Sequence, residues 1–407
     1  MVDRSMGTFD DRHAMRRLVV ESIAFHLSWL IFLYVMTDGL NLGPVPWVQS
    51  FNQWDARWYA SIGMNGHGFL PQTFVFAPAH GWFFGSITEV FFQVLWAADL
   101  RPKWVDVFSF VSIILNFLCY VIANIIVVRL AEKRFRKFAI SRPRLWLLAL
   151  SNPVGYFALT PYSDIVFYLI TMMTLLLVIM TSPRAEAWGL LSYQQTYGRV
   201  SQWALAIILF IAPWFRLTGF AFAIFGILKR KEVLACVLGL ISFLTYYWVR
   251  TGDPFFFLMA QSVFQMPEGN LLDGLWYALN VFAQGLDGLA VRGYDYFIYW
   301  FDFGFLPLAV FFTSIGFSVW SWRKGERELS LLIAGITLIS HNQAFWRSTV
   351  RYAFPVYPML SWIWLSHPST TLSRFKAKEI LTGLAVGIGF YLQIFYCRIF
   401  QSGGWAF

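Results

Sequence analysis

The sequence predicts an all-α membrane protein that crosses the bilayer several times. Of its 407 residues, 58% are apolar, 20% are aromatic and only 13% are charged. Soluble globular proteins carry about 25% charged residues, so this chain would have too little polar surface to stay in solution. Phe alone accounts for 43 positions and Trp for 20, which is typical of chain that lies in a bilayer and at its interfaces.

The spans are predicted from apolar runs of about 20 residues, the length that crosses a bilayer as a helix. The first run, 18–35, follows Arg12, Arg16 and Arg17 and has no cleavage site of small residues after it, so we expect an uncleaved anchor with a cytoplasmic N-terminus. Eleven spans are expected in all: 18–35, 104–128, 145–160, 163–181, 203–215, 217–229, 233–250, 296–321, 329–346, 350–365 and 379–399.

The apolar segment 83–98 is not counted as a span. It contains Glu89 and Gln93, and a crossing there would place the loop 129–144 outside. That loop holds seven Lys and Arg residues, the strongest sign of cytoplasmic chain under the positive-inside rule. We therefore expect 83–98 to be an interfacial helix on the outer side.

Residues 203–228 could form one long helix, but Pro213 and Arg216 lie in its middle. A proline removes a helix hydrogen bond, and a charge inside a span is costly. We therefore expect two short helices that meet at the outer face.

This topology accounts for the net charge of +9. The inner side carries 22 Lys and Arg against 10 Asp and Glu, and the outer side carries 9 against 12. The basic excess is thus a topological feature, and nucleic acid is not an expected partner. The whole chain, 1–407, is expected to form one membrane-embedded domain with two long outer segments, 38–103 and 251–295.

The first outer segment carries the best candidate for catalysis, Asp55. A carboxylate held between indole rings beside a membrane is partly desolvated, which raises its proton affinity and suits it to act as a general base or acid. The alternative is a pair of ordinary interface charges anchored by tryptophans. Candidate binding residues around it are Trp54, Arg57, Trp58 and Tyr59.

Four further polar groups fall at predicted outer ends. Tyr162 and Asp164 follow Pro161 in a hairpin between spans, where Asp164 could instead cap a helix. Arg216 lies at the broken helix pair, where a structural ion pair is an equal interpretation. The remaining candidates are Gln261 in the second outer segment and His341, Arg347 and Arg351 near the tenth span.

Arg347 and Arg351 are four residues apart, so a helix would place both on one face. Two guanidinium groups on one face favour an anion between them, and phosphate matches their geometry. A lipid head group held without specificity, or ion pairs with Asp295 and Asp302, would also explain them. We expect Arg351, Arg347 and Arg216 to bind a phosphate.

No cofactor is expected. The chain has no HExxH, Walker A or GxSxG motif and no glycine-rich nucleotide fingerprint. His67 and His80 could hold a metal with Asp55, but their separation is not a ligand spacing, so metal binding is disfavoured. An activated sugar donor would have to arrive through the lipid.

The order of these motifs resembles that of the GT-C membrane glycosyltransferases, and among them the GPI mannosyltransferase II (PIG-V) family. The resemblance covers most of the chain but consists of short motifs: Trp54 to Tyr59, Phe76-Ala77-Pro78, Asn152-Pro153 with Tyr162-Ser163-Asp164, Arg216 to Gly219, and Arg351-Tyr352 with Pro355 and Pro358. The family pattern has Glu where Asp164 stands and Asn where Thr218 stands. A prokaryotic relative with an acceptor other than a GPI precursor is therefore an equal interpretation.

The resemblance implies a GT-C fold and an inverting transfer of mannose from polyprenyl- or dolichyl-phosphate-mannose to a hydroxyl of a lipid-linked or glycan acceptor. Asp55 aligns with the family's candidate base. With this resemblance, the candidates for binding the sugar or the acceptor are Trp54, Arg57, Trp58, Tyr59, Tyr162, Asp164, Gln261 and His341. The reaction would take place on the extracytoplasmic side of a multi-pass integral membrane protein. A GT-C transferase for another sugar, and a transporter or flippase of a lipid-linked substrate, remain alternatives.

Overall fold

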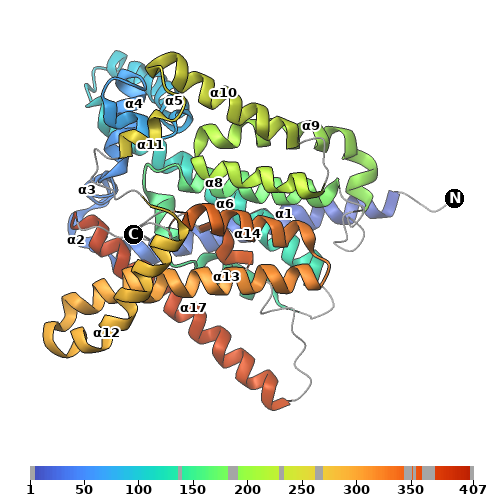
Figure 1. Cartoon of the computed structure of the whole chain (residues 1–407). Coiled ribbons are helices and arrows are strands. Elements are labelled where there is room, and N and C mark those ends of the chain that lie inside the picture. Colours follow the sequence, from blue (N-terminus) through green and yellow to red (C-terminus); the bar gives the residue numbers. More distant parts are fainter. Residues whose placement is uncertain are drawn as a thin grey trace.

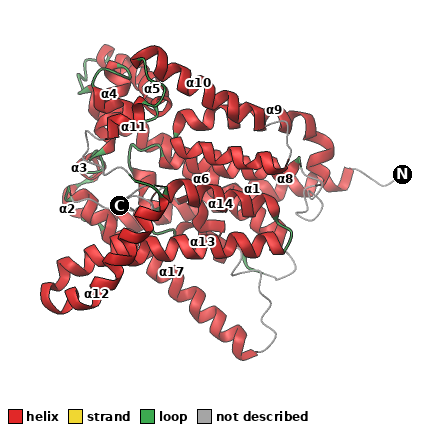
Figure 2. Ribbon diagram, in the orientation of Figure 1, coloured by secondary structure: helices red, strands yellow, loops and turns green. Residues whose placement is uncertain are grey.

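The structure is a computed structural model of the whole chain. It describes residues 5–135, 140–181, 191–228, 233–261, 269–342, 351, 354–359 and 372–403. Within these ranges the chain forms helices joined by short loops, and no strand occurs (Figure 2).

Most of the long helices run in roughly the same direction across the molecule (Figure 1). In the described part of the chain, five helices are long and apolar enough to cross a membrane: His13–Met36, Trp104–Lys133, Leu234–Thr251, Phe301–Arg323 and Glu379–Gln401. They lie in α1 (Ser5–Met36), α6 (Trp104–Phe135), α10 (Val233–Thr251), α13 (Leu306–Arg323) with the short π-helix before it, and α17 (Leu372–Gln401). This supports the predicted class, an all-α membrane protein. The number eleven stays a prediction.

One end of the bundle carries the basic loop that the sequence places in the cytoplasm. Arg142, at the start of α7 (Arg142–Leu150), forms ion pairs with Glu132 near the end of α6 and with Glu21 in α1. Arg144 pairs with Glu379 in α17 at 2.7 Å. These contacts join α1, α6, α7 and α17 at the ends that the sequence predicts to be cytoplasmic.

The opposite end is covered by short helices from the first outer segment. These are α2 (Gly39–Leu42), α3 (Pro44–Gln49), α4 (Asp55–Asn65), the 3-10 helix η1 (Pro71–Val75) and α5 (Pro78–Ala97). They gather with α11 (Phe256–Gln261) at the left of Figure 1. Nearly all of the segment 83–98, predicted as an interfacial helix, lies in α5 at this end of the bundle. Trp104 at the start of α6 donates a hydrogen bond to Glu89 of α5 at 2.9 Å.

The predicted single span 145–160 is wrong. The chain instead forms α7, a turn at Ser151–Val154 and the 3-10 helix η3 (Gly155–Leu159). The break is stabilised by the side chain of Gln393 in α17, which donates hydrogen bonds to the carbonyls of Leu150 and Asn152. An apolar run does not reveal such a break, because the groups that satisfy the freed carbonyls come from another part of the chain.

The predicted break at Arg216 is confirmed. The helix α9 (Leu191–Phe215) ends there, and the 3-10 helix η4 (Leu217–Leu228) begins directly after it. The helix α8 (Asp164–Met180) agrees with the predicted span 163–181.

The second outer segment, 251–295, differs from the expected loop. It contains α11 and most of α12 (Leu271–Trp300), which continues through a π-helix, Phe301–Phe305, into α13. The C-terminal end of α12 lies beside its first half. The hydroxyls of Tyr277 and Tyr299 are 2.6 Å apart, and Trp300 donates a hydrogen bond to the carbonyl of Phe282. Aromatic residues typical of an interface are here part of a helix.

The last predicted spans are only partly described. The helix α14 (Arg327–His341) covers the first part of the span 329–346, and the rest lies outside the described residues. Of the span 350–365, the structure describes Arg351, the 3-10 helix η7 (Phe354–Val356) and the three residues after it. The span 379–399 lies within α17.

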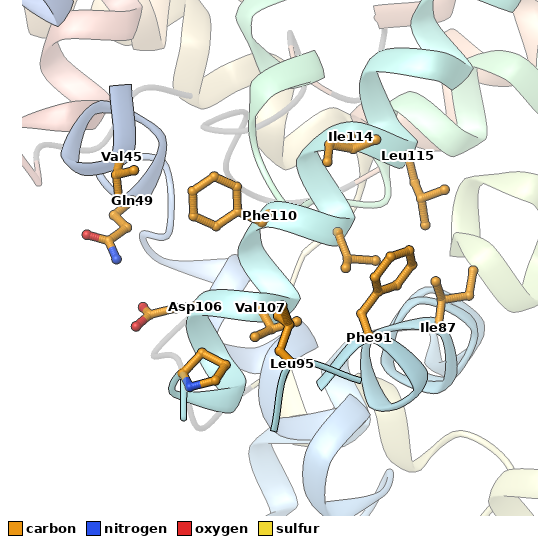
Figure 3. Close-up of a pocket in the computed structure, with 12 residues that line it drawn as sticks. Val45, Gln49, Ile87, Phe91, Leu95, Asp106, Val107, Phe110, Ile114 and Leu115 are labelled. Atoms are coloured by element: carbon orange, nitrogen blue, oxygen red, sulfur yellow. The ribbon is translucent and has the colours of Figure 1, made fainter. Parts of the chain in front are cut away.

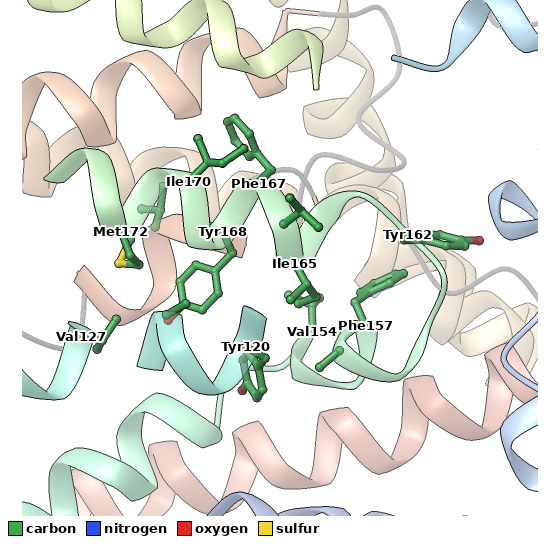
Figure 4. Packing of buried hydrophobic residues seen from close by; sticks show 14 of the residues in the cluster. Tyr120, Val127, Val154, Phe157, Tyr162, Ile165, Phe167, Tyr168, Ile170 and Met172 are labelled. Atoms are coloured by element: carbon green, nitrogen blue, oxygen red, sulfur yellow. The ribbon is translucent and has the colours of Figure 1, made fainter. Parts of the chain in front are cut away.

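The core is formed where α6, η3 and α8 pack together. Tyr120, Phe157 and Tyr168 are fully buried there beside aliphatic side chains (Figure 4). Tyr168 donates to the side-chain oxygen of Asn124 in α6 at 2.8 Å. This packing supports the end of η3 and the start of α8, which carry part of the site described next.

Candidate active site

Four charged side chains from four segments meet at the end of the bundle that carries α4. Arg351 lies 3.0 Å from Asp55 and 3.5 Å from Asp164. Arg216 pairs with Asp164 at 2.5 Å. The result is a row of alternating charges, Asp55, Arg351, Asp164 and Arg216, which we call the charge cluster.

Both carboxylates of the charge cluster lie in the first turn of a helix. Asp55 is the first residue of α4, and Asp164 is the first residue of α8. The positive end of the helix dipole and the unpaired N–H groups there favour a negative side chain. The chain enters α4 through Trp54, whose φ of 51° is unusual for a residue with a side chain.

Tyr162 connects the two helix starts. Its hydroxyl accepts a hydrogen bond from the backbone N–H of Asp55 and donates one to the carbonyl of Gln53, each at 3.1 Å. The centre of its ring lies 5.2 Å from the guanidinium carbon of Arg351. The ring centre of Phe157 lies 5.7 Å from the same carbon, so both rings make cation–π contacts with Arg351. Tyr162, predicted to bind sugar or acceptor, is thus 1% exposed and supports both Asp55 and Arg351.

Exposure differs along the charge cluster. The exposed fraction of the side chain is 17% for Asp55 and 6% for Arg351. It is 12% for Arg216 and 3% for Asp164. Asp55 is therefore the member that an incoming molecule reaches most easily.

The surroundings of Asp55 raise its pKa above the usual value of 3.8. Burial is the largest cause, and it is opposed by the neighbouring charge of Arg351. The negative charge of Asp164 raises the pKa further, while Arg216 and the hydrogen bond from Arg351 lower it. A carboxylate with a raised proton affinity can accept a proton from a hydroxyl more readily than an ordinary aspartate.

Tyr59 and His80 support the backbone beside Asp164. The Tyr59 hydroxyl and Ser163 Oγ are 2.7 Å apart, and His80 Nε2 lies 3.3 Å from the carbonyl of Pro161. Burial lowers the pKa of His80 to about 3, so this side chain is neutral. Tyr59, predicted to bind sugar or acceptor, is 6% exposed and belongs to the packing behind the site.

Trp54 and Arg57 are exposed, and Trp58 is half-buried. The side chain of Arg57 donates to Gln53 Oε1 at 3.3 Å, and Trp58 stacks on Phe76 with ring centres 6.3 Å apart. Trp54 directly before α4, and Arg57 and Trp58 within it, thus lie beside Asp55, where the prediction places a substrate.

Three predicted residues are not placed in the charge cluster. His341, at the end of α14, is buried, with Nδ1 2.8 Å from the carbonyl of Thr337 and its ring against Phe311. Arg347 lies outside the described residues, and for Gln261 the structure describes only the backbone, at the end of α11. Of the three arginines predicted to bind phosphate, the structure therefore brings Arg216 and Arg351 together.

The ion pairs of Arg351 differ from those that the sequence offered as an alternative. It pairs with Asp55 and Asp164. Asp302 instead accepts a hydrogen bond from Tyr396 at 2.5 Å. Asp295 lies in α12, and its side chain is outside the described part.

Asn116 is a supporting residue that the sequence analysis did not identify. It lies in α6, is fully buried, and its Nδ2 donates to the carbonyls of Thr160 and Tyr162 at 2.6 and 2.9 Å. It therefore holds the loop that leads to Asp164. The sequence could have indicated this role, because Asn116 lies within the apolar run 104–128 and an amide in a membrane span needs a polar partner.

A metal has no obvious ligand set in the described chain. No group of three His, Cys, Asp or Glu side chains there could hold one. His67 Nδ1 lies 3.0 Å from the Tyr246 hydroxyl, and Nε2 lies 3.0 Å from the carbonyl of Phe76. His67 thus joins the first outer segment to α10.

An apolar groove of about 480 Å³ lies at the same end of the bundle. It runs between α3, α5 and α6 and is lined by Val45, Gln49, Ile87, Phe91, Leu95, Pro102, Asp106, Val107, Phe110, Val111, Ile114 and Leu115. In Figure 3, Gln49 and Asp106 lie on one side of the groove, and Ile87, Phe91 and Leu115 lie on the other. The chain continues from Gln49 to Asp55 within six residues.

No protein-family model matches the chain, and no curated protein matches its sequence. The resemblance to GT-C enzymes therefore stays a hypothesis based on short motifs. The function is argued below from the charge cluster and the groove.

Proposed function

We propose that the protein is an inverting glycosyltransferase that moves a mannosyl residue from a polyprenyl-phosphate donor to a hydroxyl of a lipid-linked or glycan acceptor. The observation that supports this most is the contact between an accessible carboxylate, Asp55, and a guanidinium, Arg351, at the end of an apolar helix bundle. This reaction needs a base for the acceptor and a cation for the departing phosphate. Both groups stand within one ion pair.

In the proposed reaction the acceptor hydroxyl oxygen attacks the anomeric carbon of the donor sugar. The bond between that carbon and the phosphate oxygen breaks, and its electron pair leaves with the polyprenyl phosphate. Asp55 takes the hydroxyl proton, which its raised pKa favours. Arg351 stabilises the charge that develops on the phosphate, as a preorganised cation does for an oxyanion. No general acid is needed, because the leaving group is an anion of low proton affinity.

The groove between α3, α5 and α6 is a suitable place for the first part of the isoprenoid tail. It is apolar along most of its lining, and Gln49 in that lining lies six residues before Asp55. A donor whose tail lies there would extend toward α4, with its phosphate at Arg351 and its sugar beside Asp55.

The proposed function predicts that Asp55→Asn abolishes sugar transfer. Purified protein in lipid vesicles would be incubated with polyprenyl-phosphate-mannose, and with the glucose and arabinose forms in parallel, together with a membrane lipid extract. We expect a labelled product with the wild type and a loss of about 1,000-fold in rate for the variant, because Asp164, the other carboxylate of the cluster, is 3% exposed and is paired with both arginines. Asp99→Asn is the matched control, since Asp99 is an exposed carboxylate whose partner is Arg101.

Full activity of Asp55→Asn would remove Asp55 as the base. Transfer of glucose or arabinose in place of mannose would correct the identity of the donor sugar but would leave the proposed mechanism unchanged. Movement of the lipid-linked sugar across the vesicle membrane without any glycosidic product would contradict the proposal and favour a flippase.

A further inference from the structure

The ion pair between Asp164 and Arg216 joins the less exposed carboxylate of the charge cluster to its second arginine. The side chain of Asp164 is 3% exposed and that of Arg216 is 12% exposed. The Asp164 carboxylate contacts both arginines of the charge cluster through the same oxygen, Oδ1. With so little of its surface exposed, Asp164 is poorly placed to meet a sugar hydroxyl.

We propose that Asp164 and Arg216 act as a positioning pair through Arg351 and Asp55: the pair holds Arg351 against Asp55 and sets the net charge around Asp55. The inference rests on the proposed function and deepens it. It assigns Asp164 and Arg216 roles different from the sugar and phosphate contacts expected from the sequence.

The geometry gives Asp164 its part in placing Arg351. The Arg351 guanidinium is held between two carboxylates, by Asp55 through Nη2 and by Asp164 through Nε. The rings of Phe157 and Tyr162 lie beside the same guanidinium. Removing Asp164 would leave Asp55 as the one carboxylate of the described cluster that contacts Arg351.

The pair also acts through its charges, which have opposite effects on Asp55. The negative charge of Asp164 favours the protonated form of Asp55, and the positive charge of Arg216 favours the ionised form. The other groups that act on Asp55 are Arg351 and the Tyr162 hydroxyl, which is bonded to its backbone. The two effects are opposite in sign, and that of Asp164 is the larger, so each member alone should shift the titration of Asp55.

The test compares two variants that break the same ion pair. We expect Asp164→Asn to move the acid limb of the kcat/KM profile to lower pH, by about one pH unit for the loss of a charge near a partly buried carboxylate. We expect Arg216→Gln to move it to higher pH by a smaller amount. Structural damage would be shared by both variants and would not produce shifts of opposite sign.

The double variant Asp164→Asn with Arg216→Gln should move the midpoint back toward the wild-type value. It also removes the charge of Arg216, which in Asp164→Asn alone has lost its ion pair with Asp164, so it can be measured if that single variant does not fold. The comparison then uses Arg216→Gln and the double variant. Shifts in the same direction, or no shift in Arg216→Gln, would overturn the proposal.

A second measurement separates this inference from the proposed function. The raised pKa of Asp55 means that the folded protein holds its proton more tightly, so its contribution to stability falls as pH rises above 3.8 toward the pKa of the folded state. The pH dependence of the thermal midpoint of purified protein would be compared with that of Asp55→Asn. The difference in thermal midpoint between the wild type and Asp55→Asn changes with pH until Asp55 is fully ionised. This change should be complete at a lower pH in an Asp164→Asn background and at a higher pH in an Arg216→Gln background.

If no sugar is transferred by the wild type but the thermal midpoints shift in this way, the proposed function fails and the charge coupling stands. If sugar is transferred and the two variants shift neither the activity profile nor the thermal profile, the inference fails and the proposed function stands.

Discussion

At the scale of single residues, the site depends on one carboxylate that is partly accessible and another that is not. Asp55 and Asp164 both begin a helix, and both contact Arg351. The sequence suggested Asp55 because it stands between tryptophans in the first outer segment, and Asp164 because it follows Pro161 at a predicted outer hairpin. Their difference in burial, 17% against 3% exposed, comes from the packing around them and separates a group that can meet substrate from one that cannot.

A pH profile tests Asp55 at this scale. Since its pKa is raised above 3.8, the fraction of Asp55 that is ionised and able to accept a proton should still be rising above that pH. We therefore expect kcat/KM to increase tenfold per pH unit along an acid limb whose midpoint lies above 3.8, and then to level. The profile would be measured with a saturating acceptor. A midpoint below 3.8 would contradict the assignment of this limb to Asp55.

At the scale of elements, the long spans and the broken segment behave differently. The predicted spans 18–35, 104–128 and 379–399 lie within α1, α6 and α17, because an apolar run of that length has one stable form in a bilayer. The span 145–160 failed because its backbone groups find partners elsewhere. Gln393 receives a hydrogen bond from Trp29 Nε1 at 2.8 Å and donates to two carbonyls of the broken segment.

Gln393→Met is a test of that support. The change preserves the length and nearly the volume of the side chain but removes its hydrogen bonds, leaving two buried carbonyls and one indole N–H without this partner. We expect a loss of about 3 kcal/mol in the free energy of unfolding, measured by denaturant titration in detergent. Gln93→Met on α5 is the control, because Gln93 is exposed and bonds only Glu89 among the described contacts. Equal losses in both variants would contradict the role of Gln393.

The groove between α3, α5 and α6 can be tested by filling it. Ile114→Trp places a large side chain in the lining of the groove, so we expect KM for a long-chain polyprenyl-phosphate donor to rise about tenfold, equivalent to about 1.4 kcal/mol of binding. A donor with a short tail should be much less affected. Leu118→Trp, one turn further along α6 and outside the groove, is the matched control. An equal effect on both donors would show that the groove does not hold the tail.

At the scale of the whole molecule, the contacts collect the predicted inner ends at one end of the bundle and the predicted outer ends at the other. Arg142 and Arg144 bring together α1, α6, α7 and α17 at one end. At the opposite end, Arg250 near the end of α10 donates to the carbonyl of His67 at 3.0 Å. This arrangement is what the distribution of Lys and Arg predicts, although charge counts alone do not say which loops touch.

Cysteine labelling tests the side of the membrane on which each end lies. We expect Lys103→Cys, an exposed position before α6, to react with a membrane-impermeant maleimide in intact cells. Arg144→Cys, half exposed near the start of α7, should react only after permeabilisation. The wild type provides the background, since its three cysteines are buried or half-buried. The reverse pattern would place the charge cluster on the cytoplasmic side.

Class and site thus depend on different levels of information. The class, an all-α membrane protein, follows from composition, because a chain with 13% charged residues and long apolar runs has no other way to satisfy its backbone and bury its side chains. The same physics marks Asp55, Asp164, Arg216 and Arg351 as unusual, since charges near apolar runs need a reason. Which carboxylate pairs with which arginine was decided only by the tertiary structure. Ion pairs between residues far apart in the chain depend on how the helix ends converge, and that convergence is set by buried contacts such as those of Asn116, Tyr162 and Gln393.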